Sequence, residues 1–135
     1  MPTSVELIRS ARLSSLAEYA YAATAPVGAR LIFLAGACPL DQHENTVGRI
    51  SYELQASKCV ENLIVVLEAA GASLTDVITT RVLVATTNQN DLIQAWDVVR
   101  SAFGSHDVPS TLMGVTVLGY TDQLVEIEAV AAVLD

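Results

Sequence analysis

The chain has 135 residues, of which 52% are hydrophobic and only 16% are charged, and its formal net charge at pH 7 is −8. This length suits a single domain covering residues 1–135. The negative charge argues against nucleic acid as a partner, because such binding depends on Lys and Arg contacts to phosphates. The apolar runs are shorter than the roughly 18 residues of a transmembrane helix, so we expect no membrane as a partner.

The small share of charged residues predicts an interface between subunits. About 25% of the residues of an average domain are charged, and a small domain has much surface for its volume. So few charged residues leave part of the surface apolar, and contacts between the subunits of a closed, symmetric oligomer would cover it.

The cysteines and histidines predict free thiols and no bound metal. The start of the chain lacks a basic segment followed by an apolar block, so we expect a cytoplasmic protein in a reducing compartment. Cys59 lies in a helical pattern, where a cysteine is usually a small buried hydrophobic residue. Cys38 follows a glycine loop and is a candidate for lining a site. His43 and His106 lack partners at the spacing of metal ligands.

The first part of the chain predicts three strands and a loop. Residues 5–9 and 19–24 have the composition of short strands. Residues 30–36 form a more strongly apolar strand that stops at Gly36. The segment 38–49, "CPLDQHENTVGR", contains the Pro, Asp, Asn and Gly residues that favour turns and is expected to be a loop.

The second part predicts two helices separated by a strand. From Tyr52, apolar residues recur at helical spacing as far as Ala70, and Gly71 stands where helices often end. Residues 76–86 are rich in β-branched side chains and predict a strand. The second helix is expected to have Asn88 or Asn90 as its cap, an apolar stripe of Leu92, Trp96, Val99 and Phe103, and Gly104 at its end.

The chain ends with two predicted strands, residues 112–118 and 124–133. The element order is therefore β-β-β-α-β-α-β-β, which predicts an α+β fold in which a single sheet carries both helices on one face. Alternate residues of the last strand face opposite sides of the sheet. The core side is expected to hold Val125, Ile127, Ala129 and Ala131, and the helix-free side Glu126, Glu128, Val130 and Ala132.

Four sequence segments carry a family resemblance. They are "LAGACPLD", "ENLIVVLEAAGASLTDVITTRVLVATTNQNDL", "VPSTLMGVTVLG" and "LVEIEAVA". In this order and spacing, from about Tyr19 to the end, the chain resembles the YjgF/Rid family of reactive intermediate deaminases. The resemblance implies a chorismate-mutase-like α+β fold, a homotrimer, and a cleft for a small-molecule ligand at each subunit interface. It also implies hydrolysis of enamines and imines to keto acids and ammonia without a cofactor.

The resemblance further implies roles for individual residues. Glu126 matches the glutamate thought to handle the water or the proton. Thr111 stands where the best-known branch has an arginine that grips the substrate carboxylate, and Met113 stands at a position often occupied by Cys. The remaining matches are Gly36, for a glycine whose backbone meets the ligand, and Tyr21 or Tyr19, for an aromatic residue of an early strand.

The threonine at the arginine position changes the expected substrate. A guanidinium offers a carboxylate two charge-assisted hydrogen bonds, whereas a threonine hydroxyl offers one donor and one acceptor. We therefore expect a preference shifted away from 2-imino acids, with the hydroxyls of Ser110 and Thr111 as ligand partners. The alternative is a cation from an adjacent subunit, for which the candidates are Arg30, Arg49 and Arg81.

Two functional interpretations fit these residues. In the first, the protein is an enamine or imine deaminase in which Glu126 moves protons. In the second, it is a non-catalytic small-ligand-binding or regulatory trimer that keeps the cleft but has lost the chemistry, and the missing arginine supports it. Each residue also has an ordinary structural interpretation, Glu126 as a solvated or ion-paired residue and Ser110 as a turn residue that satisfies backbone groups. An endoribonuclease activity, which older naming attaches to the family, is disfavoured because the chain is acidic and has no histidines paired for acid–base chemistry.

Overall fold

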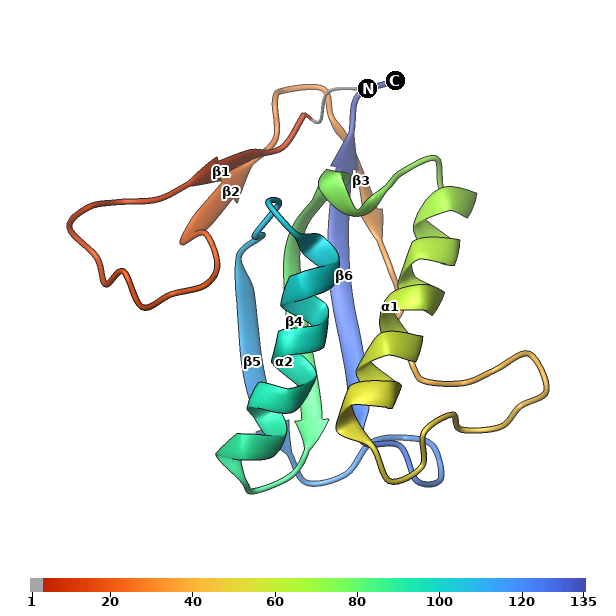
Figure 1. Cartoon of the computed structure of the whole chain (residues 1–135). Coiled ribbons are helices and arrows are strands. Elements are labelled where there is room, and N and C mark those ends of the chain that lie inside the picture. Colours follow the sequence, from red (N-terminus) through yellow and green to blue (C-terminus); the bar gives the residue numbers. More distant parts are fainter. Residues whose placement is uncertain (1–3) are drawn as a thin grey trace.

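The structure of the protein is a computed structural model that describes residues 4–135. Two helices pack on one face of a four-stranded sheet, and a two-stranded ribbon extends beside them (Figure 1). The predicted order of strands and helices is confirmed. In chain order the elements are β1 (Glu6–Ile8), β2 (Ala22–Thr24), β3 (Arg30–Phe33), α1 (Tyr52–Ala69), a short 3-10 helix (Leu74–Asp76), β4 (Val77–Ala85), α2 (Gln89–Phe103), β5 (Ser110–Val115) and β6 (Val125–Val133).

The four-stranded sheet has the strand order β3-β6-β4-β5. β4 and β5 are parallel, whereas β6 runs antiparallel to both of its neighbours, β3 and β4. α1 packs on β6, and α2 packs on β4 and β5. In the described part of the chain, the opposite face of the sheet carries no helix (Figure 1). The α+β class and the placement of both helices on one face are therefore as predicted.

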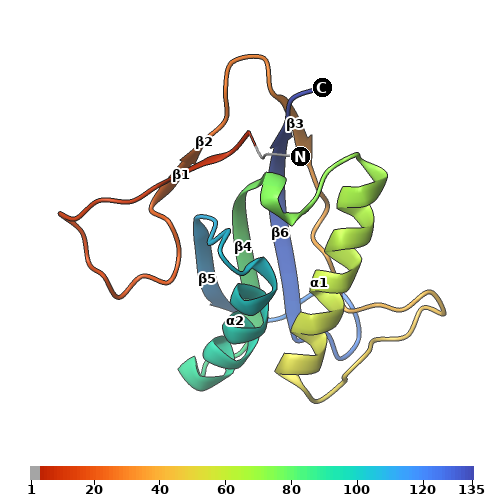
Figure 2. The same cartoon turned by 45° about the horizontal axis from the view of Figure 1, so that its top comes forward.

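The first two strands differ from the prediction of a single sheet. Within residues 4–135, β1 and β2 pair only with each other, with Glu6 opposite Thr24 and Ile8 opposite Ala22. Each strand has three residues, none of them fully buried, so neither has an apolar face that requires a place in the main sheet. The ribbon and the loop between its strands project beyond the β5 edge of the sheet (Figure 1 and Figure 2).

The ends of the two long helices are fixed by side-chain caps and a glycine. Ser51 caps α1 by accepting a hydrogen bond from a backbone N–H three residues further on, at 3.0 Å. Asn88, one of the two predicted candidates, caps α2 by accepting from the backbone N–H of Asn90 at 2.9 Å. Gly104 ends α2 with a φ of +59°. No helix within residues 4–135 is both long and apolar enough to cross a membrane.

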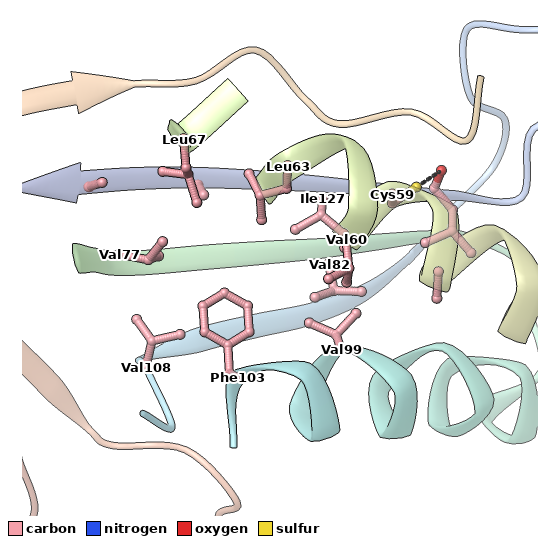
Figure 3. Packing of buried hydrophobic residues seen from close by; sticks show 14 of the residues in the cluster. Cys59, Val60, Leu63, Leu67, Val77, Val82, Val99, Phe103, Val108 and Ile127 are labelled. Carbon is pink, nitrogen blue, oxygen red and sulfur yellow. Dashed lines mark hydrogen bonds between the residues drawn. The ribbon is translucent and has the colours of Figure 1, made fainter. Parts of the chain in front are cut away.

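The hydrophobic core lies between the helices and the sheet (Figure 3). Cys59 is fully buried there, as predicted, and its thiol donates a hydrogen bond to the backbone carbonyl of Val125 at 3.4 Å. Each large apolar side chain buried in this way contributes about 1.5–3 kcal/mol of transfer free energy. The cluster includes Val60, Leu63 and Leu67 of α1, Val82 of β4, Val99 and Phe103 of α2, and Ile127 of β6.

β6 alternates between the core and the helix-free face, as predicted from its sequence. The core-facing residues Val125, Ile127, Ala129 and Ala131 are buried. On the helix-free face, Glu126, Glu128 and Val130 are half-buried, and Ala132 is buried. This face therefore presents two carboxylates, both beside β4.

Candidate functional site

The carboxylate of Glu126 is held by two donors at the start of β6. Its Oε1 atom accepts hydrogen bonds from the thiol of Cys38 at 3.2 Å and from the side-chain amide of Gln123 at 3.1 Å. The other oxygen, Oε2, lies against the backbone of Gly36, so closely that a Cβ at that position would overlap it. The predicted residues Gly36, Cys38 and Glu126 are thus brought together around one carboxylate.

The loop that carries Gly36 and Cys38 is fixed from two sides. Ala37 continues the line of β3 by exchanging two backbone hydrogen bonds with Ile127 of β6, at 2.7 and 3.0 Å. From α1, the side-chain amide of Asn62 donates to the carbonyls of Cys38 and Leu40, at 2.8 and 2.9 Å. The loop is therefore set rigidly against Glu126.

The Cys38 thiol is protonated at neutral pH. The pKa of Cys38 is raised to about 11, mainly by burial and in addition by the hydrogen bond to Glu126 and the charge of that carboxylate. The thiol therefore donates to the carboxylate and leaves the negative charge on Glu126. A neutral donor of this kind orients the carboxylate without forming a salt bridge to it.

Gln123 is a site residue that the sequence analysis missed. Its side chain is 5% exposed, and its amide group donates to both Glu126 and the backbone carbonyl of Val125. Its side-chain carbonyl accepts a hydrogen bond from the backbone N–H of Tyr120. Gln123 lies in the loop before β6, where no hydrophobic period marks a residue as buried.

Thr111 and Met113 share the helix-free face with Glu126. Register pairs place Met113 and Glu126 on either side of Leu83, and Thr111 and Glu128 on either side of Arg81. Because neighbouring strands are about 4.8 Å apart, β5 and β6 are separated by roughly 10 Å across β4. The threonine and the glutamate therefore face the same surface without touching each other.

The two hydroxyls of the Ser110–Thr111 pair point to opposite faces of β5, because side chains alternate along a strand. Ser110 is on the helix side, where its hydroxyl accepts a hydrogen bond from Thr80 at 2.7 Å. Thr111 is exposed on the helix-free side. Since β5 is an edge strand, both residues still border a cavity that runs around this edge.

That edge cavity has a volume of about 570 Å³ and aromatic walls. Both predicted tyrosines line it: the ring centroid of Tyr19 lies 6.1 Å from that of Tyr21 and 6.2 Å from that of Trp96, each pair edge to face. The indole N–H of Trp96 donates to Glu18, whose carboxylate also pairs with Arg100 at 3.0 Å. We call this space the edge cavity; its walls include Glu18, Tyr19, Tyr21 and Trp96 together with Ser110 and Thr111.

A second cavity, of about 280 Å³, lies next to Gly36 and Cys38. Asn62, Val66 and Tyr120 form other parts of its wall. The predicted site residues are therefore divided within one chain between the β3 side and the β5 side of the sheet. Within residues 4–135, no group of three or more His, Cys, Asp or Glu side chains is arranged to hold a metal ion.

The fold and these residues define a class of small α+β proteins with a mixed sheet, two helices on one face and polar groups on the other. The chain belongs to the YjgF/Rid family, since the family model described as endoribonuclease L-PSP matches residues 10–133. The resemblance that the sequence segments carry is thereby confirmed.

A relative in sequence agrees with this assignment, and solved structures agree with the fold. A RutC family protein of Pyrococcus abyssi is 33% identical over 100 residues, which cover 74% of this chain and 76% of the relative. Among solved structures, YyfB of Yersinia pestis, a Rid family protein of unknown function, has a TM-score of 0.85 at 22% identity and covers 97% of this chain and 100% of its own. A putative endoribonuclease of Thermotoga maritima has a TM-score of 0.71 at 27% identity and covers both chains fully, 100% of each.

Proposed function

We propose that this protein is a cofactor-free hydrolytic deaminase of small enamines and imines, which acts at clefts between the subunits of a homotrimer and prefers substrates other than 2-imino acids. The observation that carries the proposal is the carboxylate of Glu126, which a neutral thiol and an amide hold in one orientation. A charged, oriented carboxylate is what a general base for water requires. Family membership supports the same activity.

In the proposed reaction, a water molecule attacks the carbon of the C=N bond while Glu126 accepts a proton from it. Glu126 passes this proton to the nitrogen, which gives a carbinolamine and restores the carboxylate. Glu126 then accepts the proton of the carbinolamine hydroxyl and passes it to the amino group as the C–N bond breaks, so that ammonia leaves, the carbonyl product forms and the carboxylate is regenerated. An enamine enters the same sequence after protonation of its terminal carbon. Atoms and charges balance with water as the only co-reactant.

The division of the predicted residues between two edges of the sheet supports the trimer. Gly36 and Cys38 adjoin the β3 edge, whereas the tyrosines and Thr111 adjoin the β5 edge. A cleft that joins the β5 edge of one copy to the β3 edge of the next would surround a single ligand with both groups. Phe33, whose side chain is 75% exposed on the helix-free face, supplies apolar surface for such a contact.

The surroundings of Thr111 and the edge cavity support the substrate preference. Thr111 offers a hydroxyl and no charge, and the neighbouring walls are the rings of Tyr19, Tyr21 and Trp96. Such a site suits an apolar or ring-bearing imine better than a small carboxylate. We place this activity in the cytoplasm, because the free thiols Cys38 and Cys59 suit a reducing compartment.

A non-catalytic small-ligand-binding or regulatory trimer is the second candidate. This candidate is favoured by the side chain of Thr111, which lacks the charge of the arginine with which relatives hold a substrate carboxylate. Such a protein would keep the edge cavity and bind a ligand there without turnover.

The test compares imines with and without a carboxylate, generated in place by an amine oxidase or by an L-amino-acid oxidase. We expect the protein to accelerate ammonia release from the carboxylate-free imines, and Glu126→Gln to lower this acceleration at least 100-fold, the usual contribution of general acid–base catalysis. Glu68→Gln, the same change at an exposed position on α1, is the matched control. Binding of these imines or their products without acceleration by either protein would support the second candidate instead.

A further inference from the structure

A charged pair on the helix-free face lies in register with Thr111. Arg81 of β4 is paired with Thr111 of β5 on one side and with Glu128 of β6 on the other. Nη1 of Arg81 and Oε2 of Glu128 are 3.6 Å apart, so the two charges attract each other beyond hydrogen-bond distance. The guanidinium thus lies between a hydroxyl and a carboxylate in one row across three strands.

The register is supported by a side-chain contact one residue earlier on these strands. Thr80 and Ser110 are the preceding register pair, and their hydroxyls are hydrogen-bonded at 2.7 Å on the helix side. Arg81 and Thr111, which follow them, must therefore face the other side together. Arg81 is therefore a cation next to Thr111 that comes from the same chain and not from an adjacent subunit.

The ion pair holding Arg81 is weak. The side chains of Arg81 and Glu128 are 52% and 39% exposed, and exposed pairs contribute little because water and salt screen them. Four other arginines form ion pairs of 3.1 Å or shorter elsewhere in the described chain, namely Arg9 with Asp107, Arg30 with Asp135, Arg49 with Asp122 and Arg100 with Glu18.

The groove beside this pair would repel an anion. Arg81 and Glu128 border a groove of about 210 Å³ on the helix-free face, with Phe33, Thr79 and Val130 in its walls. Glu126 lies two residues from Glu128 on the same face of β6. This part of the face therefore holds two carboxylates and one guanidinium, and the guanidinium is already engaged.

We propose that the Arg81–Glu128 pair sets the charge selectivity of the substrate site. Glu128 occupies the guanidinium of Arg81, so a substrate carboxylate beside Thr111 must displace Glu128, whereas a substrate without a carboxylate leaves the pair intact. The inference rests on the proposed function, because that function places the substrate near Thr111 and Glu126. It deepens that function by naming the residues that disfavour 2-imino acids.

The test removes the competing carboxylate and keeps the shape of the side chain. Glu128→Gln frees Arg81, and we expect the affinity for pyruvate, a small 2-keto acid, to rise about threefold, because the ligand no longer has to displace the carboxylate of an exposed ion pair. The affinity is measured by calorimetric or NMR titration, so the result does not depend on turnover. The ratio of kcat/KM for 2-imino acids to kcat/KM for carboxylate-free imines should rise by a similar factor.

Two further variants make the result specific. Glu61→Gln removes the exposed carboxylate of an ion pair on α1, with the half-buried Lys58 at 3.1 Å, and should leave pyruvate affinity unchanged. Adding Arg81→Met to Glu128→Gln should abolish the gain. Thermal unfolding checks that every variant is folded. If Glu128→Gln does not fold, Glu128→Thr replaces it, because threonine is favoured in strands.

Three outcomes would overturn the inference: no gain in Glu128→Gln over Glu61→Gln, no pyruvate binding by either protein, or a gain that survives Arg81→Met. These outcomes differ from a failure of the proposed function. If no imine is hydrolysed but Glu128→Gln gains pyruvate affinity through Arg81, the charge selectivity stands and belongs to a binding protein. If imines are hydrolysed and the selectivity of Glu128→Gln is unchanged, only the inference fails.

Discussion

The thiol of Cys38 donates a hydrogen bond to the carboxylate of Glu126, with 3.2 Å between Sγ and Oε1. The two residues are 88 positions apart in the sequence and meet because Ala37 pairs with Ile127 along the edge of the sheet. Each group defines the state of the other: the thiol stays neutral beside the negative charge, and the carboxylate is oriented by the thiol.

The first prediction concerns the reactivity of Cys38. Because burial and Glu126 raise the pKa of Cys38 from its ordinary value of 9.0 to about 11, the thiol should react slowly with iodoacetamide at neutral pH, since the thiolate is the nucleophile. The rate in the folded protein should reach half of its maximum near pH 11. Alkylation at each pH is measured by peptide mass spectrometry, which separates Cys38 from the buried Cys59. A half-maximal rate below pH 9 would contradict this prediction.

The raised pKa also predicts how stability depends on pH. Above about pH 9 the unfolded thiol loses its proton while the folded thiol keeps it, so the free energy of unfolding should decrease from pH 9 towards pH 11. Below pH 9 the contribution is complete. Burial raises the pKa of Cys59 as well, which acts in the same direction. Urea unfolding of Cys38→Ser should therefore show a shallower decrease than the unchanged protein.

The second prediction concerns the glycine against which Glu126 lies. In Gly36→Ala the added methyl would overlap Oε2 of Glu126, so the carboxylate must turn away from Cys38 or the loop must shift. We expect a loss of about 1–3 kcal/mol in the free energy of unfolding, typical of overpacking, together with a fall in deaminase activity. Urea unfolding and the ammonia assay measure the two effects.

A matched control and a second variant identify the cause. Gly119→Ala adds a methyl where no atom lies within 4 Å and should change neither quantity. Adding Glu126→Ala to Gly36→Ala should recover most of the lost stability, because the overlapping carboxylate is gone. Equal destabilisation by Gly36→Ala with and without Glu126 would show that the glycine is needed for another reason.

The helices, the core and the alternation of β6 were predictable because their patterns are local and regular. The helical spacing from Tyr52 to Ala70 and the alternation of Val125 and Ile127 with Glu126 each specify which side chains are buried. The pairing of β1 with β2 was not predictable in this way. A three-residue strand has too few side chains to show which sheet it joins, so its partner is decided by contacts distant in sequence.

The candidate site was predictable only in part, for the same physical reason. Glu126, Gly36 and Thr111 were identified from family motifs, and the structure adds how they lie. Gln123 was missed because a loop residue carries no periodic signal of burial. The position of Arg81 beside Thr111 depends on the order β6-β4-β5, in which β4 lies between two strands that follow it in the sequence. Alternation along a strand does not specify that order.

The third prediction concerns an exchange between the two neighbouring strands. Thr111→Arg alone would place a second guanidinium directly opposite Arg81, and like charges in register destabilise a sheet by about 0.2–1 kcal/mol. Adding Arg81→Thr moves the single cation from β4 to β5 and removes this repulsion. We therefore expect the double variant to be more stable than Thr111→Arg alone, as measured by urea unfolding at low salt.

The same exchange should change the substrate preference. In the double variant the cation is two strands from Glu128 rather than one, so it is free to bind a carboxylate. The kcat/KM for 2-imino acids should rise about tenfold or more over the unchanged protein, consistent with a charge-assisted hydrogen bond in place of a neutral one. In Thr111→Arg alone, the repulsion between Arg81 and the new arginine should disappear at high salt, because screening shortens the range of their interaction. If Thr111→Arg matched the double variant in stability at every salt concentration, Arg81 and residue 111 would not interact as their register indicates.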